Sequence, residues 1–160
     1  MASSVLINTL ILALIPISEL RGALPYCYLN GNGLLLSFIL AVGANLLVIP
    51  LCWIFLETLN RLLLKMKWYE RLFDRTLRRA REKVGEKFNR FGYAGLMLFV
   101  GIPLPITGTW TGVLGAWVLG LDKKKAALFI ALGILMSACI VTALLSLGVG
   151  LNSIFIKKVQ

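Results

Sequence analysis

Two long apolar runs dominate the pattern of this chain. Residues Asn32–Leu56 and Ala126–Leu151 hold very few polar side chains. Each run exceeds the roughly 20 residues that a helix needs to cross the hydrocarbon core of a membrane. The composition is 59% hydrophobic and the mean hydropathy is +0.86, well above a typical soluble domain. The pattern therefore predicts an all-α integral membrane protein with two full spans.

Shorter apolar runs precede each span, and both are followed by helix breakers. Leu6–Ile15 and Tyr93–Gly101 would reach only about 15 Å as helices, half of the ~30 Å hydrocarbon core. Short arms around a broken loop favour re-entrant hairpins, which enter and leave the membrane on one side. We expect the hairpins to be broken by Pro16, Gly22, Pro25, Pro103, Pro105, Gly108 and Gly112.

A shift of 89 residues aligns the two halves of the chain. It places Pro16-Ile17-Ser18 on Pro105-Ile106-Thr107, and Gly31 on Gly120. Each half then has a short run, a broken loop, a second short run and a full span, an order typical of transporters with repeats. If each half crosses the membrane once, the second repeat is inverted relative to the first. A topology in which every short run spans stays open.

The charge is concentrated between the halves. Arg61–Arg90 contains eleven Lys or Arg and four Asp or Glu, and Lys123–Lys125 forms a second cluster. Short basic loops stay in the cytoplasm, so we expect both clusters there and both termini outside. The single membrane domain, 1–160, divides into a first repeat (1–57), a basic amphipathic linker (58–90) and a second repeat (91–160). We place it in the cell (inner or plasma) membrane as a multi-pass protein.

The linker predicts a basic amphipathic helix. Its apolar residues recur every three or four positions from Phe73 to Phe91. Such a helix lies on an anionic membrane surface or packs against a second subunit. We expect no nucleic-acid partner.

Glu19 and Arg21 are a charged pair within an otherwise uncharged apolar stretch. An ionisable side chain at membrane depth costs about 2.5–3.5 kcal/mol and usually marks a substrate or ion path. In one interpretation Glu19 carries a proton, and Arg21 binds an anion or resets Glu19. In the other, the two form a buried ion pair that joins the hairpins.

The second loop, residues 101–112, has no charge but is rich in hydroxyl groups. We expect Thr107, Thr109 and Trp110 to line the site with Glu19 and Arg21, although Trp110 also suits an anchor at the membrane interface. We include Asn45, whose mid-span amide fits a helix–helix hydrogen bond better than a ligand contact. The chain has no histidine, no CxxC and no metal-ligand spacing, so we expect no enzyme, metal or cofactor.

Three motifs carry a family resemblance: Glu19–Pro25, Gly43–Pro50 and Pro105–Gly112. In this order they resemble the small multidrug export proteins over nearly the whole chain. That family is distantly similar to the DedA/VTT superfamily. The resemblance implies an inverted repeat of two re-entrant hairpins, and proton-coupled movement of lipids or undecaprenyl phosphate. Ile102 and Gly108 stand where DedA proteins carry two arginines.

Together these features predict a membrane transporter, proton-coupled, for a lipid-like or amphipathic substrate such as a polyprenyl phosphate or phospholipid. An exporter of small cationic drugs is the alternative, and a non-transporting membrane scaffold is the second. The expected partners are membrane lipids and an anionic or amphipathic small molecule. Two spans offer little wall for a cavity, so we also expect a homodimer or larger homo-oligomer.

Overall fold

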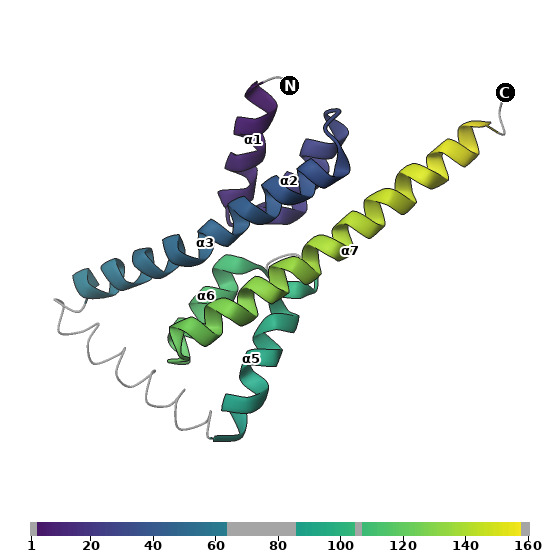
Figure 1. Cartoon of the computed structure of the whole chain (residues 1–160). Helices are drawn as coiled ribbons and strands as arrows, with labels where there is room; N and C mark the ends of the chain where they lie inside the picture. The colour runs from purple at the N-terminus through teal and green to yellow at the C-terminus, as the bar shows by residue number, and fades with distance from the viewer. Residues whose placement is uncertain (1–2, 64–85, 105–106, 158–160) are drawn as a thin grey trace.

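A computed structural model describes residues 3–63, 86–104 and 107–157, which contain helices and no strand (Figure 1). The helices are α1 Ser3–Leu14, α2 Glu19–Leu29, α3 Leu34–Leu63, α5 Glu86–Gly101, α6 Thr109–Val118 and α7 Lys123–Lys157. The all-α prediction is confirmed for these ranges. The predicted amphipathic helix of the linker lies largely outside the described residues, and the ends of the linker belong to α3 and α5.

Two of these helices are long and apolar enough to cross a membrane. The candidate spans are Leu34–Leu59 in α3 and Lys123–Gly148 in α7, with 26 residues each. They confirm the two predicted long apolar helices. Only 39% and 33% of their most apolar windows are buried inside the protein. Leu35 and Leu147, for example, are 73% and 65% exposed. Exposed apolar surface of this extent is typical of a membrane-spanning helix or of a protein–protein interface.

The order short helix, short helix, long helix occurs twice. α7 begins at Lys123, which is 89 residues after the start of α3 at Leu34. The glycines with positive φ, Gly31 (85°) and Gly120 (68°), precede these two starts with the same offset. Glycine adopts such angles at no steric cost, which suits the sharp turn into a long helix. Figure 1 shows α3 and α7 running in opposite directions, and the two helices are in contact.

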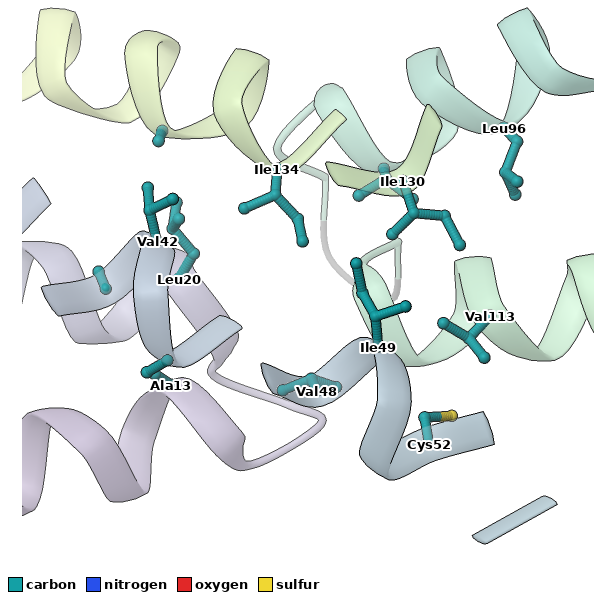
Figure 2. Packing of buried hydrophobic residues seen from close by; sticks show 14 of the residues in the cluster. Ala13, Leu20, Val42, Val48, Ile49, Cys52, Leu96, Val113, Ile130 and Ile134 are labelled. Carbon is teal, nitrogen blue, oxygen red and sulfur yellow. The ribbon is translucent and has the colours of Figure 1, made fainter. Parts of the chain in front are cut away.

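The core lies where α3 and α7 meet the shorter helices. Figure 2 shows Ile49 of α3 pointing toward Ile130 of α7, with Val113 of α6 nearby. All three side chains are buried. Glycine allows α5 to approach α7 closely, because a Cβ at Gly133 would lie 2.7 Å from the carbonyl oxygen of Met97. The short helices are thus held against the two long ones by tight packing.

The breaks are shorter than the sequence predicted. The first covers residues 15–18 and contains Pro16, and the described part of the second covers residues 102–104 and 107–108. The prediction was wrong for Gly22 and Pro25, which lie inside α2, and for Gly112, which lies inside α6.

The two misassigned glycines serve close packing instead of chain breaking. A Cβ at Gly22 would meet Ser18 Oγ at 2.0 Å, and one at Gly112 would meet Val100 at 2.6 Å. Pro25 removes only one N–H from α2, and the helix continues through it to Leu29. Pro103 and Gly108 lie in the second break, and Pro105 lies outside the described residues.

Two glycines of α7 should respond oppositely to the same substitution. Gly133→Ala should lower the free energy of unfolding by about 1–3 kcal/mol, because the new methyl group would force α5 away from α7. Gly148→Ala is the matched control: nothing lies within 4 Å of its Cβ position, so it should be neutral or stabilising by up to about 1 kcal/mol. Denaturant unfolding in mixed micelles measures both. Equal effects would contradict the packing described here.

Candidate functional site

Glu19 is the residue on which the site is built. It is the first residue of α2, its side chain is buried, and its φ is 47°. Non-glycine residues seldom adopt this left-handed conformation, which costs on the order of 1–3 kcal/mol and clusters at functional sites. Its carboxylate accepts hydrogen bonds from the backbone N–H groups of Thr109 (3.0 Å) and Trp110 (3.2 Å).

These two N–H groups form the N-terminus of α6. The first amides of a helix have no partner within the helix, and the helix dipole favours a negative charge beside them. Gly108, the N-cap residue of α6, has no side chain to satisfy them. The Glu19 carboxylate from α2 therefore caps α6 across the two halves of the chain.

Gly108 makes this contact possible. A Cβ at position 108 would lie 2.1 Å from Glu19 Oε2, so any other residue would push the carboxylate away. Position 108 follows position 19 by the same 89 residues that relate the starts of α3 and α7. The acidic residue of one half thus packs on the glycine at the equivalent position of the other.

The last carbonyl groups of α1 accept hydrogen bonds from side chains of α3 and α6. Asn45 Nδ2 of α3 donates to the carbonyl of Ala13 (3.4 Å), and Trp110 Nε1 donates to the carbonyl of Leu14 (3.1 Å). The Thr109 hydroxyl donates to Asn45 Oδ1. Broken backbone at membrane depth must find such partners inside the protein. Asn45 therefore makes the helix–helix hydrogen bonds that its mid-span position suggested.

Arg21 also reaches the second break. Its guanidinium donates to Thr107 Oγ1 (2.9 Å), and the Thr107 hydroxyl shares its proton with the carbonyls of Ile102 (3.1 Å) and Leu104 (3.0 Å). Among the described residues, the one salt bridge joins Lys123 to Glu57. Glu19 and Arg21 are therefore not paired directly. Glu19 instead bonds the N-terminus of α6, and Arg21 bonds the second break. Side chains two positions apart do not face each other on a helix.

All six predicted site residues lie around the junction of the two breaks: Glu19, Arg21, Asn45, Thr107, Thr109 and Trp110. Sequence reasoning missed two others. Cys52 donates weakly from its thiol to the carbonyl of Trp110 (3.9 Å). Ser137 of α7 lines a cavity of about 10 Å³ beside Glu19. Ser137 is one of three hydroxyl residues in its span, and no pattern in the sequence distinguishes it from Thr142 or Ser146.

A family model described as "Putative small multi-drug export protein" matches residues 19–140. The matched range begins at Glu19 and includes both the second break and Ser137. Neither a curated protein nor a solved structure matches the chain.

A double-mutant cycle tests the contact between Glu19 and Gly108. Gly108→Ala should lower the free energy of unfolding by about 1–3 kcal/mol, because the methyl group displaces the carboxylate. In a Glu19→Ala background the same substitution should cost much less, because nothing occupies that space. The substitution also changes the N-cap residue of α6, but the free-energy cost of that change is the same in both backgrounds and cancels in the cycle. Equal costs in the two backgrounds would show that the close approach does not exist.

Proposed function

The chain belongs to the small multi-drug export family, and we propose that it is a proton-coupled transporter whose site is the junction of the two breaks. The family and the two apolar spans make it a membrane protein of the transporter class. The observation that carries the finer proposal is the buried Glu19 carboxylate, which joins the two halves at the N-terminus of the short helix α6.

Helix length and charge support an inverted pair of re-entrant hairpins. α1, α2 and α6 have 12, 11 and 10 residues, which gives about 15–18 Å each, short of the ~30 Å core. Lys123 at the start of α7 pairs with Glu57 in the last turns of α3. This contact brings the basic cluster Lys123–Lys125 to the end of α3 from which the basic linker departs. Both clusters then face the cytoplasm.

Protonation of Glu19 offers a physical route to coupling. The ionised carboxylate suits the partial positive charge at the N-terminus of α6, and a neutral carboxyl group loses most of that attraction. Binding of a proton therefore weakens the contact between α2 and α6. The two breaks can then separate, which opens the junction to substrate.

Charge and shape favour an anionic amphipathic substrate. The Arg21 side chain is only partly buried, so its guanidinium is available for a phosphate or carboxylate group. An apolar cleft of about 360 Å³ lies between α5 and α6 and would accommodate an apolar tail; it is lined by Gly92, Gly95, Leu96, Phe99, Thr111, Gly115, Leu119 and Leu121. A small cation fits less well, because the Arg21 guanidinium interacts electrostatically with Glu19 and would repel a second positive charge.

Transport assays in liposomes test the roles of the charged pair. Glu19→Gln keeps the shape and removes the titration, so proton-coupled flux should fall by on the order of a hundredfold. Arg21→Lys keeps the charge but loses the planar fork, so flux should fall partially. Glu57→Gln is the matched control: it makes the same chemical change at the surface pair with Lys123 and should leave flux unchanged.

The substrates for this assay are a labelled phospholipid, a polyprenyl phosphate and ethidium, each tested from pH 6 to 8. Flux of the lipid-like molecules supports the proposal, and flux of ethidium alone would favour the drug-exporter alternative. Wild-type flux by Glu19→Gln across this pH range would show that Glu19 is a structural partner. No flux of any substrate by the wild-type protein would favour a scaffold.

Cysteine labelling tests the topology. In a cysteine-free background, Ser3→Cys should react with a membrane-impermeant reagent from outside the cell, and Lys124→Cys should react only after permeabilisation. The reason is that two re-entrant hairpins, which each return to the side they enter, and one full span, α3, separate the two positions. Labelling of both positions from the same side would contradict the inverted arrangement.

A further inference from the structure

We propose that Ser137 holds a single water molecule against the Glu19 carboxylate and that the proton reaches Glu19 through this water. The inference rests on the proposed role of Glu19 as the proton carrier and adds a binding site to it. Its basis is the surroundings of Ser137 on α7.

The Ser137 hydroxyl is buried without a protein partner. The residue is 3% exposed, and its Oγ makes no hydrogen bond within the described part of the chain. A buried hydroxyl without a partner is unfavourable, because it has given up its hydrogen bonds to water without replacing them. By contrast, Ser37 of α3, which is also fully buried, donates to the carbonyl of Gly33 (3.1 Å). The Ser137 hydroxyl therefore calls for a partner that the chain does not supply.

The adjoining cavity has the size and polarity for one water. Its volume is about 10 Å³, close to the minimum that holds a water molecule, which also needs two to four polar partners. Glu19, Arg21, Asn45 and Thr109 share the lining with Ser137. Apolar side chains complete the wall: Leu20, Val100 and Ile134. The cavity is too small for a substrate.

The carboxylate has room for this further hydrogen bond. Each Glu19 oxygen accepts one backbone N–H, and an ionised carboxylate offers about four acceptor positions. A water between the carboxylate and Ser137 Oγ would donate one hydrogen bond to a Glu19 oxygen. With Ser137 Oγ it would either donate a second hydrogen bond or accept one from the hydroxyl group. It would bring a mobile proton to the carboxylate without breaking the bonds to α6.

The proton transfer balances without another reactant. An arriving proton protonates the bound water, which passes a proton to a Glu19 oxygen and returns to neutral water. Glu19 changes from an anion to a neutral carboxyl group, and Ser137 is unchanged. Among the described residues, Arg21 of α2 and Cys52 of α3 are the ionisable groups that interact electrostatically with Glu19. Neither hydrogen-bonds the carboxylate, so neither replaces the water.

Infrared difference spectroscopy on the full-length protein in liposomes tests this site. The Glu19 carboxyl stretch is identified by its absence in Glu19→Gln, and its hydrogen–deuterium exchange is timed after transfer to D₂O. Ser137→Ala replaces the hydroxyl with a methyl group, so exchange should slow by on the order of tenfold or more. Ser137→Gly leaves space for a second water in place of the hydroxyl and should restore most of the rate. Ser37→Ala, the matched control, should have no effect.

Three results would overturn the proposal. Exchange at the wild-type rate in Ser137→Ala would show that the proton takes another route. Equal slowing in Ser137→Ala, Ser137→Gly and Ser37→Ala would indicate a general effect on packing. If no titrating band disappears in Glu19→Gln, the proton role of Glu19 itself fails and the water relay fails with it. If the Glu19 carboxyl band is present but its exchange does not depend on Ser137, only the water relay fails. If the band is absent, the proposed function fails as well.

Discussion

The Glu19 carboxylate on the N-terminus of α6 is the interaction on which the site depends. It satisfies two amides that no described residue of the second half satisfies, and it requires the glycine at position 108. The contact joins two segments that are 90 residues apart in the sequence. A charge in this position is both a structural cap and a titratable group. The same bond can therefore hold the two halves together and respond to a proton.

The membrane explains why so many polar groups converge here. A break in a helix frees backbone groups that lipid cannot satisfy, so each break must be closed by protein. At the first break, Asn45 and Trp110 donate to the last carbonyls of α1. At the second break, Thr107 bonds two carbonyls and accepts from Arg21. Side chains of α3 and α6 thus satisfy the first break, whereas the second break uses its own Thr107, to which Arg21 of α2 donates. These contacts couple the two breaks mechanically.

The sequence predicted the long apolar helices and the residues of the site better than the contacts that these residues make. Long apolar runs and charges in apolar surroundings are visible in one dimension, which is why α3, α7, Glu19 and Arg21 were found. The functions of Gly22 and Gly112 were mistaken because a glycine that permits packing looks the same in sequence as one that ends a helix. Ser137 was missed because only its three-dimensional neighbours distinguish it from other serines. The contact of Glu19 with α6 likewise appears only when the two halves are folded together.

Pulsed electron paramagnetic resonance tests most directly whether Glu19 holds the two breaks together. Spin labels at Ile17 and Leu104, which are exposed residues of the first and second breaks, report the distance between them. With Glu19 ionised, we predict one narrow distance distribution. With Glu19→Ala, the distribution should broaden and shift to longer distances, because the cap on α6 is lost. An unchanged distribution in Glu19→Ala would contradict the account.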